Sequence, residues 1–96
     1  MNKSDKWRVT VGCDLLWRFW DGEFVVFNTG SGDTHVLDAF SGEVLKSIQQ
    51  QPASAVDIAT CLADTLALSL EEVPLERITE VLAEFHTLGL IEPVQE

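Results

Sequence analysis

The chain has 96 residues, with six basic side chains against sixteen acidic ones and a formal net charge of −10 at pH 7. This length fits a single globular domain over residues 1–96, and the acidic balance disfavours nucleic acid, because such a surface repels phosphate backbones. No apolar run approaches the ~20 residues that cross a bilayer and the N-terminus lacks the apolar segment of a secretory signal, so we expect a cytoplasmic protein that does not bind membranes.

Residues 15–28 predict a β-hairpin. The segments LLWRFW (15–20) and EFVVFN (23–28) are rich in the aromatic and β-branched residues that favour strands. Asp21-Gly22 between them is typical of a type I′ turn, which needs a positive φ that glycine adopts freely. Both faces of the first strand carry apolar side chains, so part of this aromatic surface could meet a partner or a second copy. Upstream, residues 7–11 alternate apolar and polar and predict a short strand or an extended arm.

A third strand, Thr34 to Leu37, follows a glycine-rich loop. The hairpin puts residues 23–28 in the middle of the sheet, so this third strand lies at an edge. Unpaired N–H and C=O groups at an edge can pair with another extended chain, although the helices or a dimer mate could equally cover them. Asp38 comes next and predicts a helix N-cap, because its carboxylate can accept from the free N–H groups of the first turn.

The second half of the chain predicts three helices, at residues 39–50, 55–66 and 75–88, from apolar residues at helical spacing. Ser54 is a candidate cap for the second helix, and Gly89 for the end of the third. The apolar face of the third helix is wide enough to serve either the core or one wall of a groove. Strands followed by helices indicate an α+β fold, a three-stranded antiparallel sheet with three helices that resembles a winged helix-turn-helix.

No segment carries a signature of catalysis or of metal or cofactor binding. His35 and His86 lack partners at the spacing of zinc ligands. The glycine-rich loop lacks the lysine and the following helix of a phosphate-binding loop. Cys13 and Cys61 stand alone and are interpreted as buried free thiols. We therefore expect no enzymatic activity, no metal and no cofactor.

Three segments fit one family pattern: VVFN (25–28) as the middle strand, HVLD (35–38) at the strand-to-helix junction, and LAEFHTLGLI (82–91) as the closing helix and tail. Together they resemble the PqqD-like family, over a core of about residues 15–92. They are most similar to the variant found beside a kinase related to HPr kinase, in HPr-rel-A systems. Members of this family are peptide chaperones, or recognition elements, for ribosomally made and modified peptides.

The resemblance implies a function and a site. Such domains bind the leader of a precursor peptide as an added strand and present it to a modifying enzyme, here an HPr-kinase-related protein. By position, the resemblance implies an edge that pairs with the peptide backbone and a helix wall opposite it: Thr34, His35, Val36 and Leu37 for the edge, and Ile78, Val81, Leu82 and Phe85 for the wall. Some of these helix residues must serve the core instead. The tryptophan-rich start does not map onto the family core. The acidity suggests a basic leader or a basic modifying enzyme.

Two other functions are weighed against this one. In a winged-helix DNA-binding protein the third helix would enter the major groove, but its exposed positions carry one basic residue, Arg77, against three acidic ones, Glu76, Glu80 and Glu84. A homodimeric adaptor without a peptide ligand would instead use the aromatic strands as its interface and would serve a neighbouring kinase-like enzyme.

Overall fold

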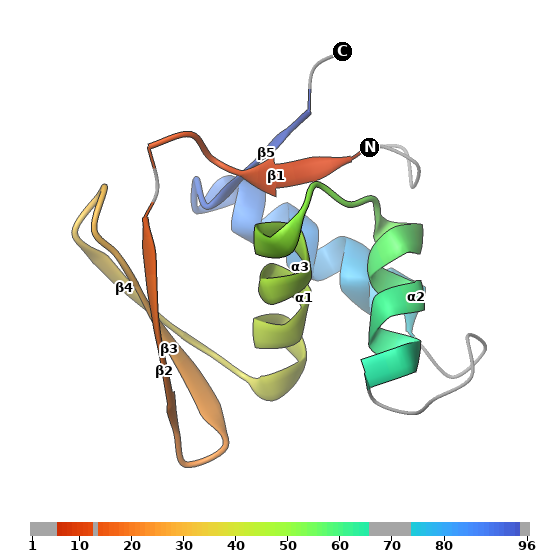
Figure 1. The fold of residues 1–96 in the computed structure, drawn as a ribbon, viewed down its shortest axis with the longest axis horizontal. Coiled ribbons are helices and arrows are strands. Elements are labelled where there is room, and N and C mark those ends of the chain that lie inside the picture. The colour runs from red at the N-terminus through yellow and green to blue at the C-terminus, as the bar shows by residue number, and fades with distance from the viewer. Residues whose placement is uncertain (1–5, 13, 66–73, 95–96) are drawn as a thin grey trace.

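The computed structural model describes residues 6–12, 14–65 and 74–94. The elements follow in the order β1 (Trp7–Val9), β2 (Leu15–Trp20), β3 (Glu23–Asn28), β4 (Asp33–Leu37), α1 (Ala39–Gln50), α2 (Ala55–Thr65), α3 (Leu75–Thr87) and β5 (Ile91–Pro93). Figure 1 shows β2, β3 and β4 as one layer beside the three helices. The predicted α+β fold, with a three-stranded antiparallel sheet and three helices, is confirmed.

The main sheet has the strand order β2-β3-β4, and both pairs are antiparallel. The turn after β2 is formed by Asp21 and Gly22, whose φ angles are 53° and 80°, as the predicted type I′ turn requires. The register sets Val26 of β3 opposite Trp17 on one side and His35 on the other. Side chains in line with Val26 therefore form the inner face of the sheet, and their chain neighbours form the outer face.

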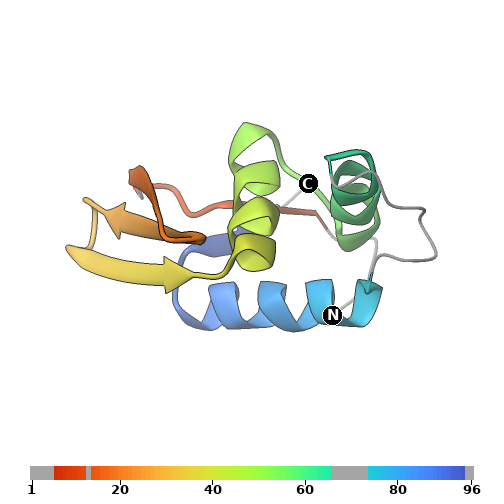
Figure 2. The same ribbon diagram turned by 90° about the horizontal axis from the view of Figure 1, so that it is seen from below.

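α1 covers the inner face of the main sheet. Figure 2 shows α1 next to the sheet, α2 on the far side of α1, and α3 running along one side of both helices with its C-terminal end close to the sheet. The Lys46 ammonium of α1 lies 4.2 Å from the ring centre of Phe24, and Trp17 Nε1 donates to Gln49 Oε1 at 2.8 Å. Gly42 lets α1 approach β3 closely, because a Cβ at this position would overlap the ring of Phe24.

The apolar stripes of the helices meet in one core, which also includes β1 and β5. Its fully buried side chains are Val44, Leu45, Ile48, Ile58, Leu62, Ile78, Val81, Leu82 and Phe85 from the helices, with Val26 from the sheet and Leu90 and Ile91 near the C-terminal end. The predicted end of the second helix, Leu66, lies outside the described residues. None of the helices that the structure describes is long and apolar enough to cross a membrane.

A second, two-stranded sheet joins the two ends of the described chain. β1 pairs with β5 in an antiparallel register that sets Trp7 opposite Pro93 and Val9 opposite Ile91. Trp7 is 3% exposed, and its ring meets the ring of His86 edge to face at 5.0 Å between centres. The Trp7 N–H also donates to the Ala53 carbonyl at 2.9 Å. Of the two alternatives predicted for residues 7–11, a short strand or an extended arm, the structure shows a strand, over Trp7–Val9. This strand lies across one end of the helical layer (Figure 1).

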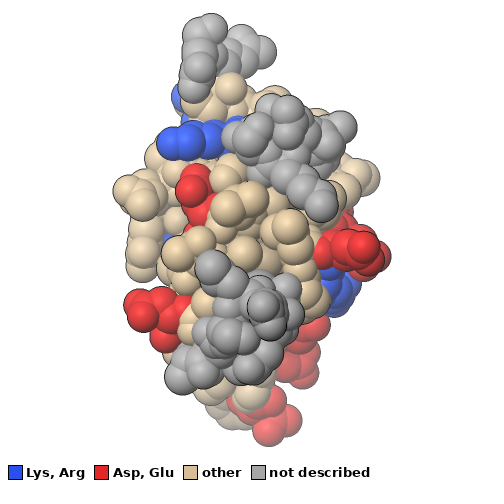
Figure 3. Space-filling model, turned by 90° about the vertical axis from the view of Figure 1, so that its right-hand side faces the viewer, with Lys and Arg blue, Asp and Glu red and all other residues tan. Residues whose placement is uncertain are grey.

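Acidic residues outnumber basic ones by sixteen to six in the sequence. In Figure 3, which views the molecule from the α2 side, acidic groups spread around the outline and basic groups occupy fewer places. Among the described residues, three ion pairs form, at N···O distances of 3.6–3.8 Å: Arg8–Glu92, Arg77–Asp38 and Arg77–Glu80. Much of the negative charge is therefore uncompensated in the described part of the chain.

Candidate functional site

A groove of about 370 Å³ lies between β4 and α3. The two elements run in roughly opposite directions, with the end of β4 nearer the start of α3 (Figure 1). Residues from the strand, the start of α1 and one face of α3 line the groove: Thr34, His35, Val36, Leu37, Asp38, Ser41, Arg77, Glu84, Phe85 and Leu88.

The strand side of the groove is the predicted edge. β4 pairs with β3 on one side, and no other described strand pairs with it. In an antiparallel pair, alternate residues turn their N–H and C=O groups away from the partner strand, so β4 presents a row of such groups to the groove. Thr34 and Val36 are exposed, His35 is half-buried and Leu37 is buried. All four predicted edge residues line the groove.

On the helix side, most of the residues that the sequence resemblance implied lie in the core. Ile78, Val81 and Leu82 are fully buried in the core and do not line the groove. Phe85 is 2% exposed and touches the groove from beneath. The reason is geometric: the apolar stripe of an amphipathic helix turns toward the core, so a groove beside it is walled by the flank of that stripe.

Three groove residues of α3 were missed from the sequence: Arg77, Glu84 and Leu88. They fall at i, i+7 and i+11, a spacing that places them on one face of the helix. This signal was present in the sequence, but only the position of β4 reveals which flank of the apolar stripe faces the groove.

The end of the groove near α1 carries an ion-pair network. The Asp38 carboxylate caps α1 by accepting from the Ser41 N–H at 2.7 Å. This backbone hydrogen bond is the main reason that the pKa of Asp38 lies below its ordinary value, and the nearby Arg77 lowers the pKa further. Arg77 Nη2 lies 3.8 Å from Asp38 Oδ2, and Arg77 Nη1 lies 3.7 Å from Glu80 Oε2. One guanidinium is thus shared by two carboxylates.

The opposite end of the groove is both acidic and apolar. Glu84 and Leu88 are exposed and lie one helical turn apart. No basic nitrogen of the described residues forms an ion pair with the Glu84 carboxylate. This end can therefore accept a positive charge and an apolar side chain side by side.

The outer face of the main sheet adjoins the groove at β4. By the strand register this outer sheet face consists of Leu16, Arg18, Trp20, Glu23, Val25, Phe27, Thr34 and Val36. No described helix packs on it, and Trp20 is 78% exposed and Val36 62% exposed. Exposed apolar patches of this kind are uncommon on monomeric proteins that bind no partner.

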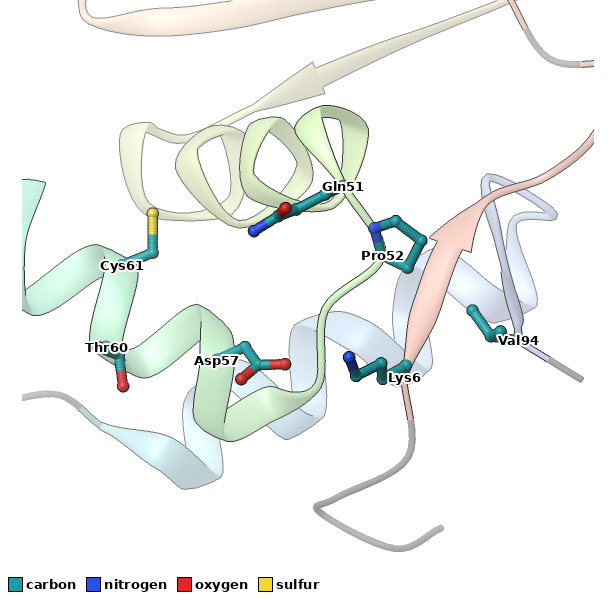
Figure 4. Close-up of a pocket in the computed structure, with 7 residues that line it drawn as sticks. All are labelled: Lys6, Gln51, Pro52, Asp57, Thr60, Cys61 and Val94. Carbon is teal, nitrogen blue, oxygen red and sulfur yellow. The ribbon is translucent and has the colours of Figure 1, made fainter. Parts of the chain in front are cut away.

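A second hollow, of about 700 Å³, lies between the end of α1, α2 and the start of β1. Figure 4 shows Lys6 and Asp57 on one side of it and Cys61 on another. Asp57 belongs to a capping box, because its N–H donates to Ser54 Oγ at 3.1 Å and its carboxylate accepts from the Ser54 N–H at 3.0 Å. Ser54 thus caps α2 as predicted.

The thiols differ in part from the prediction. Cys61 is free, as expected, but it is exposed rather than buried, because it lies on the face of α2 that lines the second hollow. Ser47 Oγ donates to its sulfur at 3.4 Å. Cys13 lies outside the described residues. Within the described ranges, no three His, Cys, Asp or Glu side chains come together as a metal site.

These features define a class: a small α+β domain in which an open edge strand borders a helix-walled groove. A solved structure with this fold is TbiB1 in complex with the TbiA(beta) leader peptide. It superposes with a TM-score of 0.66 at 13% sequence identity, and the match covers 93% of this chain and 99% of that chain. The sequence matches no protein family model and no curated protein. At this identity the likeness establishes the fold.

Proposed function

We propose that this protein is a non-catalytic peptide chaperone. It captures the leader of a ribosomally made precursor peptide as a strand added to β4 and presents it to a modifying enzyme. The observation that carries the proposal is the open edge of β4 beside a groove. Its support from outside the chain is the shared fold with a protein that was solved with a leader peptide bound.

The mechanism needs no catalytic group. Main-chain hydrogen bonds to β4 supply affinity that tolerates many sequences, and alternate side chains of the peptide enter the groove and supply selectivity. Ordering an unstructured leader costs conformational entropy, so we expect moderate affinity. A bound leader keeps its precursor close to the modifying enzyme and raises the effective concentration of the substrate.

The proposed binding set combines the edge with the groove face of α3. On the strand it comprises Thr34, His35, Val36 and Leu37, and on the helix Phe85, Arg77, Glu84 and Leu88. Ile78, Val81 and Leu82 would act indirectly, by fixing α3 to the core. The PqqD-like subtype, the HPr-rel-A setting with its HPr-kinase-related enzyme and the cytoplasmic location belong to the same proposal, and they rest on the sequence resemblance.

The test is a titration of isotopically labelled protein with the peptides encoded beside its gene, followed through backbone amide shifts. We expect the shifts to cluster along β4 and around Glu84 and Leu88. A matched pair of peptides, N-methylated at odd or at even positions, sharpens the test. Only alternate peptide N–H groups face β4, so one methylated series should lose binding and the other keep it. Equal loss in both series, or shifts elsewhere, would contradict strand addition.

A second function is favoured by the outer sheet face. We propose as the alternative that two copies associate through this face and form an adaptor for a kinase-like enzyme without a peptide ligand. The face carries one basic residue, Arg18, and one acidic residue, Glu23, so it is locally neutral on an acidic molecule. Two copies can therefore approach here with the least repulsion.

The alternative is tested by sedimentation equilibrium. We expect a dimer mass that reverts to a monomer mass in Trp20→Ser, while Val56→Ser, which alters an exposed apolar residue on α2, keeps the wild-type mass. A monomer mass at every protein concentration would rule out the homodimer. It would leave the peptide chaperone as the remaining proposal.

A further inference from the structure

We infer that the peptide strand bound in the groove carries a basic side chain opposite Glu84 and, two residues away toward Leu88, an apolar one. This inference rests on the proposed function and names the class of peptide that the site selects. Three observations carry it: the charge state of the groove, the spacing along α3 and the alternation of a paired strand.

The charges of the groove do not balance. Besides the imidazole of His35, its lining holds two carboxylates, those of Asp38 and Glu84, and one guanidinium, that of Arg77. Arg77 is already engaged with both Asp38 and Glu80. The remaining described basic residues belong to other parts of the molecule and are Lys6, Arg8, Arg18 and Lys46.

The two acidic groups of the groove differ in what they can offer a ligand. Asp38 is held as the cap of α1 by the Ser41 N–H and by Arg77. Glu84 has no ion-pair partner among the described residues, and it occupies an exposed helix position that lines the groove. A lysine or arginine of the peptide would therefore find its counter-charge at Glu84.

The spacing fixes where the apolar residue falls. Glu84 and Leu88 are four residues apart on α3, which is about 6 Å along the helix axis. Side chains two apart on an extended strand, on the same face, are separated by about 6.8 Å. A strand that follows β4 runs along α3, because β4 and α3 line the groove together (Figure 1). A basic residue at Glu84 thus places an apolar residue over Leu88, with Phe85 beneath it.

The contribution of Glu84 to peptide affinity should be modest, because this residue is exposed to solvent. An exposed ion pair contributes a modest free energy, so loss of the Glu84 charge should weaken a matched peptide by about two- to fivefold. Reversal of the charge replaces attraction with repulsion, and we expect about tenfold weakening at low salt. Both effects should shrink as salt is added, because the pair is exposed to solvent.

The experiment selects short linear peptides from a random display library on the whole chain, in parallel with Glu84→Lys and Glu76→Lys variants. Glu76→Lys makes the same change in net charge at an exposed position of α3 outside the groove. Wild type and Glu76→Lys should enrich Lys or Arg two residues from an apolar residue, and Glu84→Lys should enrich Asp or Glu there. Synthetic winners are then measured by fluorescence anisotropy. A Lys→Glu peptide should regain affinity on Glu84→Lys.

The outcomes separate this inference from the proposed function. Suppose that the selected peptides shift the amide resonances of β4 but show no preference for Lys or Arg, or that this preference is lost equally in Glu84→Lys and Glu76→Lys. Either result would overturn the role of Glu84 and leave strand addition intact. A failure of every selected peptide to shift the Thr34–Leu37 amides overturns the proposed function itself.

Discussion

Gly42 lies inside α1 with its backbone against the ring of Phe24. An alanine in a helix is normally more stable than a glycine by up to about 1 kcal/mol. Here the added methyl group would overlap the ring, so we expect Gly42→Ala to lower the free energy of unfolding by about 1–3 kcal/mol. Urea unfolding followed by tryptophan fluorescence measures the change. A smaller side chain at position 24 should relieve this overlap. We therefore expect Gly42→Ala to lower the free energy of unfolding by less in a Phe24→Leu background than in the wild type. A Gly42→Ala variant more stable than wild type would refute this account.

Asp38 gives a pH-dependent contribution to stability. The Ser41 N–H, with Arg77, lowers its pKa in the folded state below the ordinary value of 3.8. A group whose pKa falls on folding stabilises the protein above its unfolded pKa, and that stabilisation is lost as the pH falls through the folded pKa. Asparagine can cap the helix but does not titrate.

We therefore expect wild type to be more stable than Asp38→Asn at neutral pH and the difference to shrink in acid, below about pH 4. Urea unfolding of both proteins across that range measures it. Asp57→Asn should behave in the same way at α2, because the pKa of Asp57 is lowered, chiefly by the Ser54 N–H. A difference that stays constant across the pH range would mean that the carboxylate charge contributes nothing.

At the scale of elements, one buried side chain of β1, that of Trp7, anchors the second sheet to the helices. Trp7 packs on His86 and in the core, and its backbone pairs with both Pro93 and Ala53. We expect Trp7→Ala to lower the free energy of unfolding by about 3–5 kcal/mol, as large-to-small changes in cores do. Val11, which is exposed, is the control, and Val11→Ala should change stability by less than about 0.5 kcal/mol. Urea unfolding measures both changes. A loss of stability in Trp7→Ala as small as that in Val11→Ala would show that β1 contributes little to the stability of the fold.

At the scale of the whole molecule, like charges repel. The net charge is −10, and the described residues form three ion pairs. Added salt screens repulsion between exposed charges, so the melting temperature should rise by about a few degrees between low and moderate salt. NaCl and KCl should act alike, and circular dichroism melts measure the effect. A melting temperature that falls with salt would mean that the ion pairs outweigh the repulsion.

The main sheet, the three helices and the caps could be predicted because their signals are local. The turn at Asp21-Gly22, the cap at Asp38 and the apolar periodicity of α1 each depend on neighbours within a few residues. The order of the elements then limits the sheet to a meander with β4 at its edge. Local chemistry therefore suffices for this half of the fold.

Contacts between distant segments could not be predicted. The pairing of β1 with β5 joins residues such as Val9 and Ile91, and no periodicity in either segment names the other. The close approach of Gly42 to Phe24 likewise leaves no local signal, so this glycine looks like a flaw in α1. The groove residues of α3 were missed for the same reason, because Glu84 lines the groove only through the position of β4, which is distant in the sequence.

If this chain is the carrier of a leader peptide, as proposed, the position of β4 between the groove and the outer sheet face determines how an enzyme would recognise the bound leader, its cargo. A leader strand paired with β4 would turn every second side chain outward, beside Thr34 and Val36, and widen that face from three strands to four. An enzyme docked there would touch carrier and cargo as one continuous surface. It would then distinguish a loaded carrier from an empty one without any change in the shape of the carrier.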